Sequence, residues 1–101
     1  METVTVQTAY DEIVAHIRKE GSGAGHWYAG IASDWKDRLQ DHGVDTETEN
    51  HWYIARECED DESARSVEEA LIEYVCDGGG GGGSKSTTWV YAYRKTASTD
   101  P

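Results

Sequence analysis

The chain contains few of the side chains that normally fill a protein core. Leu, Ile, Val and Phe together account for 14 of its 101 residues, with two Leu and no Phe. That share lies below the roughly 20% at which a high net charge begins to favour disorder. Four Trp and six Tyr lie in segments with regular apolar spacing, and each large ring can bury about 150–250 Å². We therefore expect a single folded domain over residues 1–101, with a core built mainly on aromatic rings.

The charged side chains are strongly unbalanced, with 20 Asp and Glu against 9 Lys and Arg and a formal net charge of −11. In dilute salt such a surface repels nucleic acid and anionic membranes. An acidic, Lys-poor composition is also typical of a halophilic protein, and at molar salt the Debye length falls to about 3 Å. The sequence therefore predicts a halophilic origin, under which the net charge does not exclude a nucleic-acid partner.

Neither a membrane segment nor a secretion signal is indicated. The chain has no run of 18 apolar residues, and its acidic N-terminal stretch lacks an apolar signal core. Cys58 and Cys76 match no metal-binding spacing. We expect a cytoplasmic protein without membrane contact, in which both cysteines are free thiols that fill core space.

The apolar spacing predicts three helices that alternate with three strands. The helices are expected over residues 8–20, 34–42 and 64–76, and the strands over 26–32, 51–58 and 87–95. The fold class is therefore α+β, with a small, mostly antiparallel sheet flanked by three helices. The sheet has three strands, or four if the first six residues add an edge strand. The glycine-rich segment 77–86 is expected to form a flexible loop, and the tail 96–101 to fray.

On the third predicted helix, a carboxylate interrupts the apolar face. At about 100° per residue, Glu68 falls between Val75 and Ile72, on a face that also includes Tyr74. Burying a carboxylate is costly unless it is hydrogen-bonded, paired or bound to a metal. Glu68 is therefore a candidate functional carboxylate, or else it lies at the rim of this face or pairs with an arginine.

The second predicted helix places two polar side chains beside its apolar ridge. Trp35, Leu39 and His42 share one narrow arc, and Arg38 lies next to it. Arginine binds phosphate through bidentate charged hydrogen bonds, and histidine can act as a general base or hydrogen-bond partner. Arg38 and His42 are thus candidates for a phosphate site. Alternatively, Arg38 pairs with Asp34 along the helix and His42 is solvated.

These positions resemble the signature of the GIY-YIG endonucleases. The second half of that signature is a Tyr-aliphatic-Gly strand, a short Ser/Thr-x-Asp turn, and Arg-Leu and His one turn apart on a helix. A later helix carries a metal-binding glutamate. The resemblance covers residues 26–76 and rests on Tyr28-Ala29-Gly30-Ile31-Ala32-Ser33-Asp34, Arg38-Leu39, His42, Ala64-x-x-x-Glu68 and Leu71-Ile72.

The resemblance implies an endonuclease that depends on Mg²⁺ or Mn²⁺ and acts on DNA or RNA. Tyr28 would be the second signature tyrosine, one of the groups that activate water. Arg38 would steady the phosphate, with His42 beside it in the catalytic group, and Glu68 would hold the metal. One carboxylate together with water and substrate oxygens is a normal set of ligands for Mg²⁺.

Two parts of the family pattern are absent. No Gly-Ile/Val-Tyr strand precedes Tyr28, and no late asparagine follows Glu68. The strand 87–95 can replace the missing strand if it pairs beside Tyr28, as in a circular permutation. Tyr91, or else Tyr93, would then take the role of the first tyrosine.

Other interpretations stay open. The chain could be a non-catalytic relative that serves as an interaction module, or an acidic partner-binding protein in which Glu68 pairs with Arg56 or Arg65. The glycine run 78–83 matches no phosphate-binding motif and is expected to be a linker. A zinc site is conceivable at His26, His42, His51 and Cys58, although the spacing matches no short motif. Base stacking is conceivable at Trp52, Trp89, Tyr91 and Tyr93.

Overall fold

The computed structural model describes residues 3–20, 26–44, 53–78 and 87–95, which form three helices and a four-stranded mixed sheet. The predicted α+β class with three helices is therefore confirmed. The elements follow one another in the order α1 (Val6–Glu20), β1 (Trp27–Ala32), α2 (Trp35–Asp41), β2 (Tyr53–Glu57), α3 (Asp61–Tyr74), β3 (Asp77–Gly78) and β4 (Trp89–Arg94).

The C-terminal strand lies inside the sheet rather than at its edge. The strand order is β2-β4-β1-β3, and β4 runs antiparallel to both β1 and β2. Its register with β1 places Tyr93 opposite Tyr28 and Tyr91 opposite Gly30. The predicted pairing of the C-terminal strand beside Tyr28 is thus confirmed.

The fourth strand does not come from the N-terminus, as the sequence suggested. It is β3, which pairs in parallel with β1 at Tyr28 and Ala29, so its two residues are wrongly predicted as loop. A strand of two residues has no alternation that a sequence pattern can reveal. Near the N-terminus, Val4 forms an isolated parallel bridge to Cys58, and α1 already begins at Val6. The rest of the expected loop, 79–86, and the tail 96–101 lie outside the described residues.

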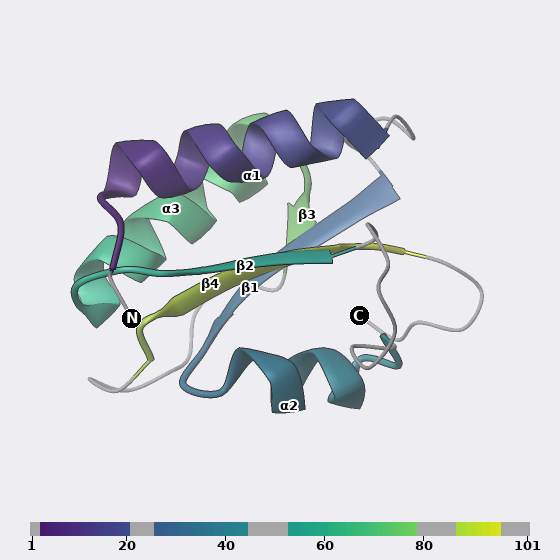
Figure 1. Ribbon diagram of the computed structural model, residues 1–101. Coiled ribbons are helices and arrows are strands. Elements are labelled where there is room, and N and C mark those ends of the chain that lie inside the picture. The colour runs from purple at the N-terminus through teal and green to yellow at the C-terminus, as the bar shows by residue number, and fades with distance from the viewer. Residues whose placement is uncertain (1–2, 21–25, 45–52, 79–86, 96–101) are drawn as a thin grey trace.

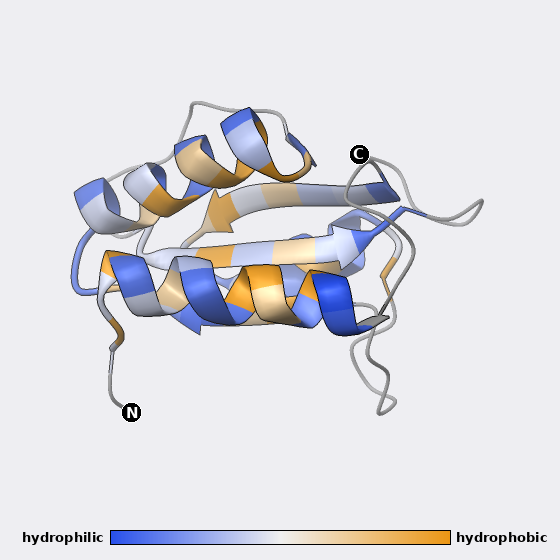
Figure 2. Cartoon of the chain, turned by 90° about the horizontal axis from the view of Figure 1, so that it is seen from above, coloured by the Kyte–Doolittle hydropathy of each residue, from blue (hydrophilic) through white to orange (hydrophobic). Residues whose placement is uncertain are grey.

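The sheet has a different core on each face. Helices α1 and α3 cover one face and α2 covers the other (Figure 1). Hydrophobic residues are interspersed with hydrophilic ones along α1 and α3, as in amphipathic helices (Figure 2). Small and aliphatic side chains dominate the core beneath these two helices, and among the described residues Trp27 is the one aromatic ring buried in that cluster. The expectation of a ring-based core is therefore wrong for this face.

The core beneath α2 does consist largely of rings. Tyr91 and Tyr93 are buried there with Leu39, and Tyr28 and Trp35 pack against them. Tyr91 and Tyr93 are alternate residues of β4 and therefore point to the same face of the sheet. Both cysteines are free and buried, as predicted. None of the helices in the described part of the chain has the length and apolar character needed to cross a bilayer.

Candidate functional site

Helix α2 has only seven residues, so its two ends largely determine its position. At its start, the Asp34 carboxylate accepts the Asp37 N–H at 3.1 Å, a typical N-cap. At its end, Gly43 has a φ of 86°, the left-handed conformation that glycine adopts readily. Leu39 is fully buried against the sheet between these ends. The caps and this anchor hold Arg38 and His42 one turn apart at the C-terminal end of the helix.

His42 lies among tyrosine rings and touches one hydroxyl. Its Nε2 is 3.0 Å from the Tyr91 hydroxyl oxygen. The distances from its ring centroid to those of Tyr28, Tyr91 and Tyr93 are 5.6, 5.8 and 5.0 Å. His42 is half-buried as a result, which contradicts the alternative of a solvated side chain.

The surroundings of Tyr91 change the pKa of its hydroxyl. Its side chain is 2% exposed, and burial is the main cause that raises its pKa to about 12. The Arg38 guanidinium acts in the opposite direction, through its charge and through hydrogen bonding to the hydroxyl, whereas the Tyr28 and Glu68 charges raise the pKa further. At neutral pH Tyr91 is therefore a neutral phenol, able to donate its proton to a histidine or to an anionic oxygen.

Gly30 makes room for the Tyr91 ring. A Cβ built at Gly30 would meet the Tyr91 hydroxyl and would lie 2.6 Å from its Cζ. Real Cβ atoms essentially never come so close to another atom, so a larger residue at position 30 would displace the ring. The sequence includes Gly30 in the family-like motif, but the reason for a glycine becomes visible only in the register of β1 with β4.

Glu68 is buried on the opposite side of the sheet from Tyr91. Helix α3 packs on β1 and β4, and Glu68 is 3% exposed on its inner face. Strand β3 pairs with β1 no further than Ala29, so no strand of the described residues covers the β1 edge beside Gly30. The Glu68 charge is nevertheless close enough to raise the Tyr91 pKa.

The Glu68 carboxylate has no hydrogen-bond or ion-pair partner within the described ranges. The arginines considered for it pair elsewhere: Arg56 with Glu12 at 2.6 Å and Arg65 with Asp61 at 3.8 Å. Burial raises the Glu68 pKa, and the nearby Arg65 charge opposes this increase. A salt bridge from Glu68 to either arginine is therefore not the explanation for its burial.

The buried face of α3 is narrower than the sequence pattern suggested. Tyr74, expected on the apolar face, is 73% exposed. The buried positions of this helix are Ala64, Val67, Glu68 and Leu71. They share one narrow arc of the helix, and Tyr74 falls at its margin. Glu68 lies at the edge of this arc, yet the residue is only 3% exposed.

A metal at this site would have to use a single protein carboxylate. No three His, Cys, Asp or Glu side chains gather into a metal-ligating group among the residues that the structure describes. His51, named in the zinc hypothesis, is outside them, as is Trp52. Glu68 alone still fits a Mg²⁺ or Mn²⁺ ion that takes its other ligands from water and substrate phosphate, because carboxylate oxygens are ligands that these ions prefer.

No family model matches the chain, and neither a curated protein nor a solved structure matches it. The function is therefore inferred from the residues themselves. Four of the predicted site residues, namely Tyr28, Arg38, His42 and Tyr91, lie together at one end of α2. The fifth, Glu68, lies on α3, and its charge raises the pKa of Tyr91.

Proposed function

We propose that this protein is a metal-dependent phosphodiesterase of the GIY-YIG type that cleaves nucleic acid. The observation that carries the proposal is the 3.0 Å approach of the Tyr91 hydroxyl to His42 Nε2, with Tyr28 and Arg38 gathered around it. In this proposal β4 stands in for the missing Gly-Ile/Val-Tyr strand. Tyr91 takes the role of the first tyrosine in preference to Tyr93, because its hydroxyl contacts His42 and is affected by the Arg38 charge.

Arg38 is the phosphate-binding group of the proposed site. It is exposed to solvent on α2 and lies close enough to Tyr91 to lower the pKa of that hydroxyl. A guanidinium binds phosphate oxygens in a bidentate manner and keeps its charge at every relevant pH. A phosphate held by Arg38 would therefore lie beside the Tyr91 hydroxyl.

Tyr91 and His42 form the proton relay of the proposed reaction. When water attacks phosphorus, the Tyr91 oxygen accepts a proton from the water while its own proton passes to His42 Nε2. The new O–P bond forms as the bond to the leaving oxygen breaks, and the leaving oxygen takes a proton from solvent. The relay requires the His42 tautomer in which Nε2 carries no proton, so that Nε2 accepts the hydrogen bond from the Tyr91 hydroxyl. Tyr28 packs against the His42 ring and holds its orientation.

Glu68 is the residue that would hold Mg²⁺ or Mn²⁺. When bound, the ion would neutralise charge on the phosphate that is being cleaved. A buried carboxylate destabilises the fold unless it has a partner, and Glu68 has none among the described residues. A side chain whose function is to bind a cation is expected to carry this cost in stability.

A second candidate function is a non-catalytic interaction module. The observation that favours it is the net charge of −11, since a nucleic-acid-binding domain usually carries an excess of basic side chains and this chain has 9 basic against 20 acidic ones. The Tyr91–His42 contact would then be retained for packing alone.

The finer statements on cellular context are also proposals. Two buried free thiols agree with a reducing, cytoplasmic compartment. The acidic composition agrees with a salt-rich, halophilic cytoplasm, where screening would permit approach to DNA or RNA.

The proposal is tested by incubating plasmid DNA, branched DNA and RNA with the protein at low and at molar KCl, with Mg²⁺ or Mn²⁺. Cleavage by the wild type that is lost in Glu68→Gln supports it. Cleavage that persists in Glu68→Gln contradicts the metal role. Absence of cleavage by a folded wild type under all conditions favours the interaction module.

A further inference from the structure

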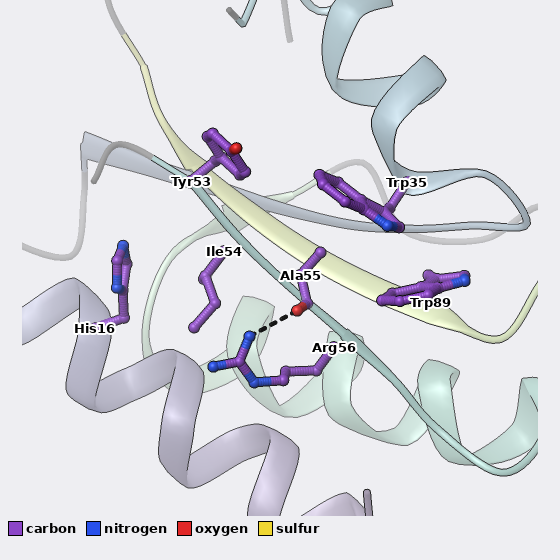
Figure 3. A pocket seen from close by; sticks show the side chains of 7 residues that line it. All are labelled: His16, Trp35, Tyr53, Ile54, Ala55, Arg56 and Trp89. Carbon is purple, nitrogen blue, oxygen red and sulfur yellow. Dashed lines mark hydrogen bonds between the residues drawn. The ribbon is translucent and has the colours of Figure 1, made fainter. Parts of the chain in front are cut away.

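Beside β2 the surface is hollowed by a pocket of about 450 Å³. On the α2 side of the strand the pocket is lined by three aromatic rings, those of Trp35, Tyr53 and Trp89 (Figure 3). His16 and Arg56 line it from the α1 side. The volume falls within the roughly 300–1,000 Å³ range of small-ligand sites.

The three rings form one half-buried cluster. The Trp35 centroid is 5.9 Å from that of Tyr53, with 27° between the planes, and 5.9 Å from that of Trp89, at 45°. All three side chains are partly exposed, unlike Tyr91 and Tyr93 further along β4. Their packing leaves ring surface available to a planar ligand.

The pocket is built on the two elements that carry the proposed phosphate site. Trp35 is the first residue of α2 and lies three positions before Arg38. Trp89 and Tyr91 are alternate residues of β4, on the same face and about 7 Å apart along the strand. When a nucleotide phosphate lies at Arg38, a neighbouring base would therefore be within reach of the aromatic pocket.

The edge of β2 is poorly suited to a peptide strand. Arg56 Nη1 donates to the Ala55 carbonyl at 2.8 Å, and the Val4 N–H donates to the Glu57 carbonyl at 2.8 Å. A strand that paired at this edge would have to displace both hydrogen bonds. The aromatic rings, rather than the backbone, are the accessible recognition groups.

We propose that this aromatic pocket receives one unpaired nucleobase of the nucleic acid whose phosphate lies at Arg38. The inference rests on the proposed function and specifies its substrate as a strand with at least one unstacked nucleotide. Duplex bases are held in their stack and cannot enter, whereas a single-stranded or flipped base can.

The proposed base site is tested by measuring binding of nucleic acid rather than its cleavage. A fluorescently labelled single-stranded oligonucleotide is titrated with the protein in EDTA and molar KCl, and its anisotropy is measured. Trp35→Leu and Tyr53→Leu are expected to weaken binding about fivefold or more. Tyr74→Leu removes an exposed ring of α3, which does not line the pocket, and is expected to bind like the wild type. A fully paired duplex of the same sequence is expected to bind at least about fivefold more weakly than the single strand.

Unchanged binding by both folded pocket variants, or equal affinity for the duplex, would overturn the base site. Two variants are used because either ring could contribute to stability, and thermal melting identifies a variant that is unfolded. The result is separable from the cleavage assay. Binding that depends on the rings, without cleavage, would support the base site and contradict the phosphodiesterase. Cleavage that depends on Glu68, with binding that does not depend on the rings, would support the phosphodiesterase and contradict the base site.

Discussion

The Tyr91 hydroxyl and His42 Nε2 meet at 3.0 Å, although 49 positions separate the two residues in the chain. Tyr91 belongs to β4, one of the two inner strands of the sheet, and His42 is the C-cap of the short helix that covers this face. The contact therefore joins the sheet to α2 at the point where Arg38 and Tyr28 also converge. A change to either element should disturb the same polar group.

Gly30→Ala tests the space that the Tyr91 ring requires. The added Cβ would overlap the ring, so we expect a loss of about 1–3 kcal/mol in the free energy of unfolding, measured by urea denaturation. In the double variant with Tyr91→Phe, which lacks the hydroxyl nearest to the new methyl group, the loss should be smaller than the sum of the two single effects. Strict additivity would contradict the described contact.

Glu68→Gln is expected to stabilise the folded protein at neutral pH. Burial raises the Glu68 pKa above its ordinary value of 4.5, so the folded state favours the protonated form. The ionised side chain therefore costs stability at neutral pH, and this cost disappears as the pH falls below 4.5, where folded and unfolded chains are both protonated. We expect a gain on the order of 1 kcal/mol, roughly 4–8 °C in Tm for a chain of this size.

Glu69→Gln is the matched control for that measurement, because Glu69 is exposed on the outer face of the same helix. Its Tm should stay close to that of the wild type. A Glu68→Gln variant that melts below the wild type at neutral pH would show that a favourable partner of the carboxylate had been removed.

The two thiols should be unreactive while the protein is folded. Burial raises the pKa of Cys76 to about 12 and also raises that of Cys58, and both side chains are inaccessible. The thiolate is the reactive form, so a disulfide reagent at pH 8 should label neither residue until urea unfolds the chain. Rapid labelling of two thiols without denaturant would contradict this burial.

The halophilic hypothesis predicts that stability rises with salt. Self-repulsion among the excess acidic groups destabilises the compact state at low ionic strength and is screened at high ionic strength. The Tm should increase by several degrees, roughly 4–8 °C per kcal/mol, between dilute and molar KCl. An unchanged Tm over that range would refute the hypothesis.

The sequence predicts most of this architecture because most elements have clear periodicity. The helical spacing of Ile13 and Ile17 and the alternation along β4 identify their elements directly. Asp34 and Gly43 mark the ends of α2 by their capping chemistry. Arg38, His42 and Glu68 are identified as candidate site residues from their positions on the predicted helices, before any tertiary structure is known.

Relations between elements are what the sequence does not reveal. The need for glycine at position 30 depends on the register that places Tyr91 opposite it. The aromatic pocket draws Trp35, Tyr53 and Trp89 from three separate elements, so no local pattern joins them. The strand β3 is recognised only by its pairing with β1, because two residues are too few to show the periodicity of a strand.

The most direct measurement of the proposed mechanism is the single-turnover cleavage rate of Tyr91→Phe with Mn²⁺ at molar KCl. The substitution removes one oxygen and keeps the ring that packs beneath α2. Tyr10→Phe, on α1 at the other face of the sheet, is the control for the loss of a phenol oxygen. We predict a decrease of about a hundredfold or more for Tyr91→Phe and a rate near that of the wild type for Tyr10→Phe. Cleavage by Tyr91→Phe at the wild-type rate would contradict the proton relay between Tyr91 and His42.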